Sequence, residues 1–503
     1  MLARHARGLG QGPLAFGPLM QLVRNLSEWA TVDPQKLSGS APGTCANLVS
    51  GRWQPSRESR LLPDPLNGQP FISVPHTQPD EIAPFVESLR AVPKTGLHNP
   101  LKNPQRSLTG YGWLLGLRTA LHLHLHLHLH LHLHLHLHPE YYGGERTGIP
   151  RGVRFLARGF TVPGDHPGQT SSGNRWPYGP VALITPFNFP LEIPALQLMG
   201  ALYMGNKPLL HVDQRVSIVA EQLLRLLHHC GMPPADVDLL HGPGATCGAV
   251  LAAAQPRSTL FTGSQRVAER LAVETHGKVF LEDAGFDWKI MGPDVRDVDY
   301  VAWQCDQDAY ACSGQKCSAQ SMLFAHRSDG GRWELFANLP SAGAKLLFGG
   351  KPLTGHSIPG VYGAIEPTAV FVPLEEALRP EHFEAVTTEV FGPFQVVTEW
   401  RDGQLPLVLE ACERMTNHLT AAVVSNDINF VQTVLANTVN GTTYAGIRAR
   451  TTGAPQNHWF GPAGDPRGAG IGTPEAIRLV WSCHREIITD FGPVPPASAL
   501  KLS

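Results

Sequence analysis

The chain has 503 residues, of which 42% are hydrophobic and 16% charged, and its formal net charge is −2. This length is sufficient for two or three domains with separate cores, and the near-neutral charge excludes the basic surface expected of a nucleic-acid or anionic-membrane partner. No apolar run reaches the length of a membrane span.

The N-terminal segment differs from the rest of the chain. Residues 1–27 contain Arg4, Arg7 and Arg24 and no acid, and Glu28 is the first carboxylate. A basic, apolar and acid-free start is typical of an organelle presequence, although a tail with a chance charge bias would look the same. We therefore expect a mitochondrial transit peptide, with presequence and linker together covering 1–40.

The cysteines do not form a framework. Eight are scattered along the chain and no Cys-x-x-Cys pair occurs, although three cluster over 305–317. This pattern predicts free thiols in a reducing compartment, and neither a disulfide scaffold nor a structural zinc site.

The first elements are short. We expect a strand near 51–53, a turn over 64–68 and a second strand over 71–74. Residues 80–90 have the apolar spacing of a helix.

Leu121 to His138 is a run of nine Leu-His repeats. As a strand it would extend about 60 Å, and as a helix it would have no apolar stripe. The run is either a metal-binding histidine tract or a translated simple DNA repeat, and the second interpretation is favoured.

Globular character returns at residue 153. Residues 153–177 predict a long hairpin, and short apolar strands then alternate with helices. The expected strands are 181–184, 208–212, 236–240 and 259–262, and the expected helices are 195–204, 216–230, 246–254 and 265–274. This alternation predicts an α/β fold with a parallel, doubly wound sheet.

The run Ala311–Gln320 contains the candidate nucleophile, Cys317. Small neighbours leave this thiol open to approach, and Lys316 is expected to favour the thiolate, which is the form that attacks a carbonyl.

Two upstream residues complete a set that can oxidise an aldehyde through a thioester. Asn188, after a predicted strand, has an amide that can donate to an oxyanion, and Glu282, at another strand end, can act as a general base for water. The alternative for Asn188 is a loop asparagine that only satisfies backbone groups. The alternative for Glu282 is a solvated glutamate at a strand end.

Three further segments suit a dinucleotide. Gly242–Gly244 opens a predicted helix, where a phosphate or a plain tight turn fits equally well. Gly263 and Ser264 follow a strand, with Ser264 as a natural N-cap. Glu389 precedes Phe391 by two residues, which suits a ribose contact beside a ring on a planar cofactor, although an edge strand and a turn would also explain it.

Together these residues resemble the aldehyde dehydrogenase superfamily over about 45–110 and 153–503. The segments 177–210, 281–322 and 440–485 are most similar to its plant-type mitochondrial glutamate-semialdehyde dehydrogenases. The resemblance implies an aldehyde dehydrogenase fold with a Rossmann-like cofactor domain, an α/β catalytic domain and an oligomerisation arm. Its implied bounds are 41–152 with 178–281 for the NAD-binding domain, 282–478 for the catalytic domain, and 153–177 with 479–503 for the arm.

The resemblance also implies a role for each matched residue. Cys317 is the nucleophile, Asn188 and the Cys317 N–H hold the oxyanion, and Glu282 activates water. NAD is the implied cofactor, and its implied contacts are Thr185, Pro186, Phe187, His211, Gly242, Gly263, Ser264, Glu389 and Phe391. Ser318, Gly453 and Ala454 are implied to hold the substrate, L-glutamate 5-semialdehyde, which becomes L-glutamate in the mitochondrial matrix. A homo-oligomer is implied, and no resident metal.

Three departures separate this chain from the family pattern. His211 replaces a lysine that holds the adenine ribose, the Leu-His tract replaces helices over about 112–152, and the segment at about 326–335 is shortened. They leave two alternatives: an impaired or inactive remnant, including one from a wrong gene model, and a histidine-tract metal module.

Overall fold

The computed structural model describes residues 28–102, 158–283, 285–327, 343–360, 362–452, 461–471, 473–494 and 496. The presequence, the Leu-His tract and most of the shortened segment lie outside these residues, as do Gly453 and Ala454. The predictions made for them remain predictions.

The first large sheet is mainly parallel, as predicted. Its strand order is β12-β11-β8-β9-β10-β2-β3, with only β2 and β3 antiparallel. The bounds are β2 Asn47–Val49, β3 Arg52–Gln54, β8 Pro180–Thr185, β9 Lys207–Val212, β10 Asp238–Leu239, β11 Ser258–Thr262 and β12 Val279–Glu282. Every residue of β9 and β11 is buried, as expected for strands covered on both faces.

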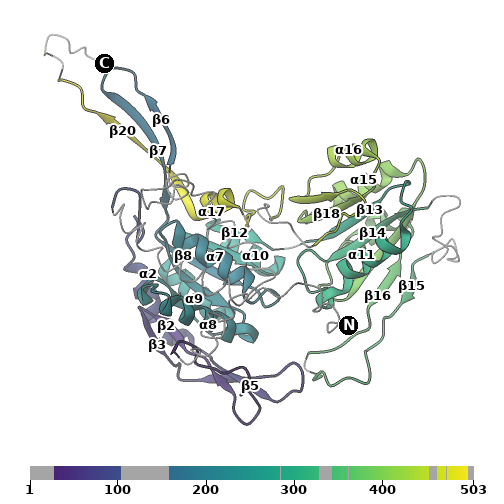
Figure 1. The fold of residues 1–503 in the computed structure, drawn as a ribbon, viewed down its shortest axis with the longest axis horizontal. Helices are drawn as coiled ribbons and strands as arrows, with labels where there is room; N and C mark the ends of the chain where they lie inside the picture. The colour runs from purple at the N-terminus through teal and green to yellow at the C-terminus, as the bar shows by residue number, and fades with distance from the viewer. Residues whose placement is uncertain are drawn as a thin grey trace, which may run out of the picture.

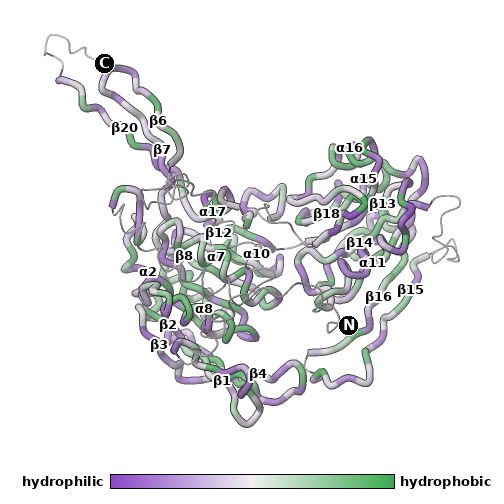
Figure 2. The backbone as a smooth tube through the Cα atoms, in the orientation of Figure 1, coloured by the Kyte–Doolittle hydropathy of each residue, from purple (hydrophilic) through white to green (hydrophobic). Residues whose placement is uncertain are grey.

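Helices cover both faces of this sheet (Figure 1). One core cluster joins α7 and α8 to the face that includes Leu183 and Leu210; the other joins α2, α9 and α10 to the face that includes Ala182 and Leu209. The bounds are α2 Ala83–Arg90, α7 Glu192–Tyr203, α8 Ser217–His229, α9 Gly244–Ala254 and α10 Gln265–Glu274. Apolar residues concentrate in these strands and on the helix sides that face them (Figure 2).

The second large sheet has the order β15-β16-β17-β14-β13-β18-β19, and only β15 is antiparallel to its neighbour. The bounds are β13 Asp287–Met291, β14 Gln320–His326, β15 Lys345–Phe348, β16 Thr368–Phe371, β17 Phe394–Trp400, β18 Thr420–Val424 and β19 Thr442–Ala445. Two core clusters lie against it, one including Val301 of α11 (Val298–Tyr310) and the other packing α13 to α16. Those helices are α13 Leu374–Ala377, α14 Pro380–Val386, α15 Leu405–Arg414 and α16 Ile428–Ala436.

A three-stranded antiparallel sheet projects from the first large sheet (Figure 1). It contains β6 (Arg158–Pro163), β7 (Gln169–Pro177) and β20 (Ser482–Asp490), and β20 follows α17 (Pro474–Trp481). β6 and β7 form the predicted hairpin, and β7 pairs with β20 along its whole length. A second three-stranded sheet consists of β1 (Gly43–Thr44), β5 (Pro70–Pro75) and β4 (Ser59–Pro63).

Local differences from the predicted elements have simple causes. The strand expected over 236–240 is reduced to Asp238–Leu239 because Pro234–Asp236 forms a turn of 3₁₀ helix, with prolines at 233 and 234. The helix expected from residue 80 begins at Ala83, after another 3₁₀ turn. Among the described residues, no helix combines the length and apolar character needed to cross a bilayer.

Candidate active site

A cavity of about 780 Å³ brings most of the predicted site residues together. All three predicted catalytic residues and all nine predicted cofactor contacts line it. They are Thr185, Pro186, Phe187, Asn188, His211, Gly242, Gly263, Ser264, Glu282, Cys317, Glu389 and Phe391. Ser318 is buried and does not line the cavity. Gly453 and Ala454 lie outside the described residues.

The topology of the first sheet explains this convergence. β8, β9, β11 and β12 run parallel, so their carboxyl ends lie along one edge. Thr185 ends β8, Glu282 ends β12, and Gly263 directly follows β11. This edge is where open α/β sheets bind their ligands.

The loop that carries Cys317 has a constrained backbone. Cys312, Ser313 and Gly314 all have positive φ, at 58°, 56° and 65°. A Cβ on Gly314 would lie 2.1 Å from the carbonyl oxygen of Gly392, so the nucleophile loop packs directly against the segment that bears Glu389 and Phe391. The loop therefore holds the thiol beside the cofactor contacts.

Glu282 and Cys317 lie close enough to influence each other's ionisation. Burial raises the pKa of Glu282 to about 7, while interaction with the Cys317 thiol opposes this rise. Burial first, and then the Glu282 charge, raise the pKa of Cys317 well above its ordinary value. The resting nucleophile is thus a protonated thiol beside a carboxyl group that ionises near neutral pH.

Lys316 attracts the Cys317 thiolate, as expected, but it does not determine the resting state of this thiol. Its Nζ donates to the carbonyl of Gln307 at 3.5 Å, and burial lowers its own pKa. The surroundings of Cys317 favour the thiol because desolvation and nearby carboxylates outweigh this single cation. Thiolate formation therefore requires a local proton acceptor.

Both other polar groups of the catalytic set are available for a ligand. The two carboxyl oxygens of Glu282 are buried without a hydrogen-bond partner among the described residues. Asn188 borders the same cavity, and within the described chain its side-chain amide makes no hydrogen bond. The alternatives of a solvated glutamate and a backbone-satisfying asparagine are therefore not what the structure contains.

His211 is buried at the far end of the cavity. Its Nδ1 lies 3.0 Å from the carbonyl oxygen of Leu240, and burial lowers its pKa, so the imidazole is neutral with Nδ1–H donating.

Sequence reasoning missed two neighbours that also line this end. Arg215 stacks over the Phe187 ring at 4.0 Å and pairs with Asp213 at 2.7 Å. The only sequence signal for them was their position just after a buried strand.

The cavity residues fit a dinucleotide. A Cβ at Gly263 would lie 2.5 Å from the Phe261 ring, so only glycine allows this backbone to pass there. Ser264 occupies the N-cap position of α10 as predicted, but its side chain makes no capping hydrogen bond. This hydroxyl therefore does not occupy the N–H groups of the first turn of α10. A helix end that binds phosphate needs such N–H groups to be available.

Comparison with known proteins gives the same picture. The model of the aldehyde dehydrogenase family matches residues 153–331. The chain is 56% identical to the mitochondrial delta-1-pyrroline-5-carboxylate dehydrogenase 12A1 of Arabidopsis thaliana, over 93% of this chain and 92% of that protein. It is 57% identical to a probable aldehyde dehydrogenase of Linum usitatissimum, over 93% and 92%.

Solved structures agree at the level of the fold. An indole-3-acetaldehyde dehydrogenase in complex with NAD+ superposes with a TM-score of 0.72 at 17% identity, over 94% of this chain and 99% of that one. A Staphylococcus aureus betaine aldehyde dehydrogenase with NAD+ gives 0.71 at 16% identity, over 93% and 99%. With the high identity to the two plant proteins, this fold and this cavity show that the chain belongs to the aldehyde dehydrogenase family.

Proposed function

We propose that this enzyme oxidises L-glutamate 5-semialdehyde to L-glutamate with NAD in the mitochondrial matrix, as a step of proline breakdown. One observation carries the proposal. The Cys317 thiol lies near the buried carboxyl group of Glu282, which has no other hydrogen-bond partner among the described residues, and both line a cavity suited to a dinucleotide. The substrate and the compartment follow from the identity to the Arabidopsis protein, whose name includes both.

The first half of the reaction forms a carbon–sulfur bond. The Cys317 thiol loses its proton to the Glu282 carboxylate, and the sulfur adds to the aldehyde carbon. The carbonyl oxygen becomes an oxyanion, which the Asn188 amide and the Cys317 N–H stabilise by about 3 kcal/mol for each well-placed donor. A bound NAD would supply the hydride acceptor, and loss of hydride from this carbon would leave a thioester on Cys317.

The second half releases the acid. With its proton returned to solvent, Glu282 takes a proton from water, and the resulting hydroxide attacks the thioester carbon. The carbon–sulfur bond breaks, glutamate leaves, and Cys317 is regenerated. The reliance on a buried carboxylate favours hydrolysis over transfer of the acyl group to a thiol such as coenzyme A.

Several other predicted residues have a specific role in this proposal. Gly263 and Ser264 border the pyrophosphate, and Glu389 and Phe391 border the nicotinamide ribose. Ser318, Gly453 and Ala454 hold the amino-acid end of the substrate. The first large sheet belongs to the cofactor domain and the second to the catalytic domain, and the β6–β7–β20 sheet is the oligomerisation arm. NAD is proposed over NADP from the resemblance to the plant-type mitochondrial enzymes, since among solved proteins of this fold some hold NAD+ and others NADP.

The test is formation of NADH from pyrroline-5-carboxylate by the purified chain. Cys317→Ala should abolish it, whereas Cys312→Ala, which alters an exposed thiol five residues away, should leave most of it. Equal rates in the Cys317 variant and the parent would refute the catalytic assignment. No NADH from any aldehyde would instead favour the inactive alternative.

A further inference from the structure

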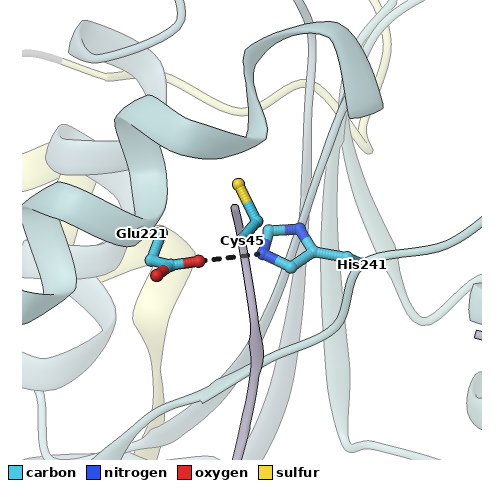
Figure 3. Close-up of side chains that lie close together, drawn as sticks. All are labelled: Cys45, Glu221 and His241. Carbon is cyan, nitrogen blue, oxygen red and sulfur yellow. Dashed lines mark ion pairs between the residues drawn. The ribbon is translucent and has the colours of Figure 1, made fainter. Parts of the chain in front are cut away.

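Three metal-ligating side chains meet outside the active site (Figure 3). Cys45 follows β1, Glu221 lies in α8, and His241 follows β10. One ligand atom from each lies within 4.8 Å of the others, and His241 Nε2 is 3.9 Å from Glu221 Oε2. Their exposed fractions are 3%, 0% and 0%.

His241 shows that this cluster is more than a chance meeting. Both of its ring nitrogens are fully buried and have no hydrogen-bond partner in the described part of the chain. The Ala46 backbone lies near the ring without a hydrogen bond of good geometry. Leaving such a group unsatisfied costs about 1–3 kcal/mol. A neutral imidazole is the form that ligates metals.

We propose that Cys45, Glu221 and His241 form a structural site for a borderline-soft divalent cation, Zn²⁺ by preference. Thiolate, imidazole and carboxylate are the three donors that zinc takes in proteins. Hard cations such as Mg²⁺ would not use the thiolate, whereas the carboxylate disfavours Cu(I). The thiolate and the carboxylate offset most of the positive charge of the ion and of Arg225, which pairs with the same carboxylate.

The surrounding contacts allow such a site with small movements. Bonds of about 2.0–2.3 Å place tetrahedral ligand atoms roughly 3.5 Å apart, so the widest separation, which is at most 4.8 Å, must shorten by no more than about 1.3 Å. Glu221 Oε1 accepts from Arg225 at 2.8 Å, which fixes the carboxylate, while Oε2 accepts from the Ala46 N–H at 2.7 Å and lies 3.9 Å from His241 Nε2.

The position gives the ion a role. It would join three segments that are distant in the sequence and that no disulfide connects. His241 immediately precedes Gly242, which lines the cofactor cavity. The site would therefore hold one wall of that cavity in place.

The experiment uses the full chain, purified without metal affinity, stripped with a chelator and titrated with Co²⁺ as a spectroscopic substitute. A sulfur-to-cobalt charge-transfer band reports a thiolate ligand, and the Leu-His tract, which has no cysteine, cannot produce it. We expect the band to saturate, with an intensity that corresponds to one thiolate ligand per chain, and to vanish in both Cys45→Ser and Cys45→Ala. Cys247→Ser, which alters another buried cysteine of the same sheet region, should keep it.

The thermal stability of the protein in the presence of Zn²⁺ provides a second measurement. Stoichiometric Zn²⁺ should raise the thermal midpoint of the parent and of Cys247→Ser, and should not raise that of Cys45→Ala. His241→Gln should weaken cobalt binding at least tenfold. No charge-transfer band in the parent, or a band that survives both Cys45 substitutions, would overturn the site. None of these readouts depends on dehydrogenase activity.

Discussion

The pKa of Glu282 gives the sharpest prediction for catalysis. With a pKa of about 7, half of the carboxyl groups are ionised at neutral pH, and about a tenth at pH 6. We expect kcat to rise with pH through about 7, because only the ionised form accepts a proton. Glu282→Gln should lower kcat by about 10²–10³ and remove this limb of the profile.

The assay is a steady-state pH profile of NADH formation with a rapid-mixing measurement of the first turnover. Glu269→Gln is the matched control, since this exposed glutamate pairs with Arg467 and does not line the cavity. If Glu282→Gln keeps more than a tenth of the parent kcat, or the same pH limb, the assignment of the base is wrong.

The same pKa predicts a cost in stability. The folded carboxyl group ionises near 7 and the unfolded one near 4.5, so the folded state binds more protons between these values. The contribution of this group to the free energy of unfolding is fully present below pH 4.5. It is lost as the pH rises through 7, which lowers the free energy of unfolding by about 3 kcal/mol. Glu282→Gln should therefore be more stable than the parent at pH 8, with the difference shrinking toward pH 5 in urea unfolding. Equal stability at both pH values would contradict the buried, unpartnered carboxyl group.

Three further outcomes are expected. His211→Lys should tighten NAD binding severalfold, measured by fluorescence titration, since it supplies a longer, charged donor to the adenine ribose; unchanged affinity would count against this role. Asp308→Ala should lower the free energy of unfolding in urea by about 3–5 kcal/mol, because it leaves the fully buried Lys289 ammonium, 2.9 Å away, without its partner. As the control, Asp306→Ala at an exposed position should change the free energy of unfolding by about 0.5 kcal/mol or less. Gly263→Ala should weaken NAD binding with kcat at saturating NAD largely kept, and an unchanged dissociation constant would contradict the close backbone approach.

Much of the first sheet could be predicted because its strands are short apolar runs between strong turn signals. The helix predicted over 265–274 coincides with α10, and the strand predicted over 259–262 forms most of β11. Asn188, Glu282 and Cys317 were predicted to act together because an amide donor, a carboxylate and a thiol form the set that oxidises an aldehyde through a thioester, and all three line one cavity.

Other features depend on contacts between distant segments and gave no local signal. The resting ionisation of Cys317 depends mainly on its burial and on Glu282, 35 positions upstream, and these outweigh the attraction of the neighbouring Lys316. The Cys45, Glu221 and His241 cluster has no motif spacing, since three separate elements supply it. The predicted domain bounds and the arm's role in assembly remain predictions.

The pairing of β7 with β20 has a consequence for synthesis of the chain. Strand β7 cannot pair with β20, its partner along the whole strand, until about 300 intervening residues have been translated. Until then one edge of β7 has unpaired backbone groups that can recruit a foreign strand. A stop codon shortly before residue 482 would therefore yield a product with both large sheets encoded but a persistent tendency to aggregate.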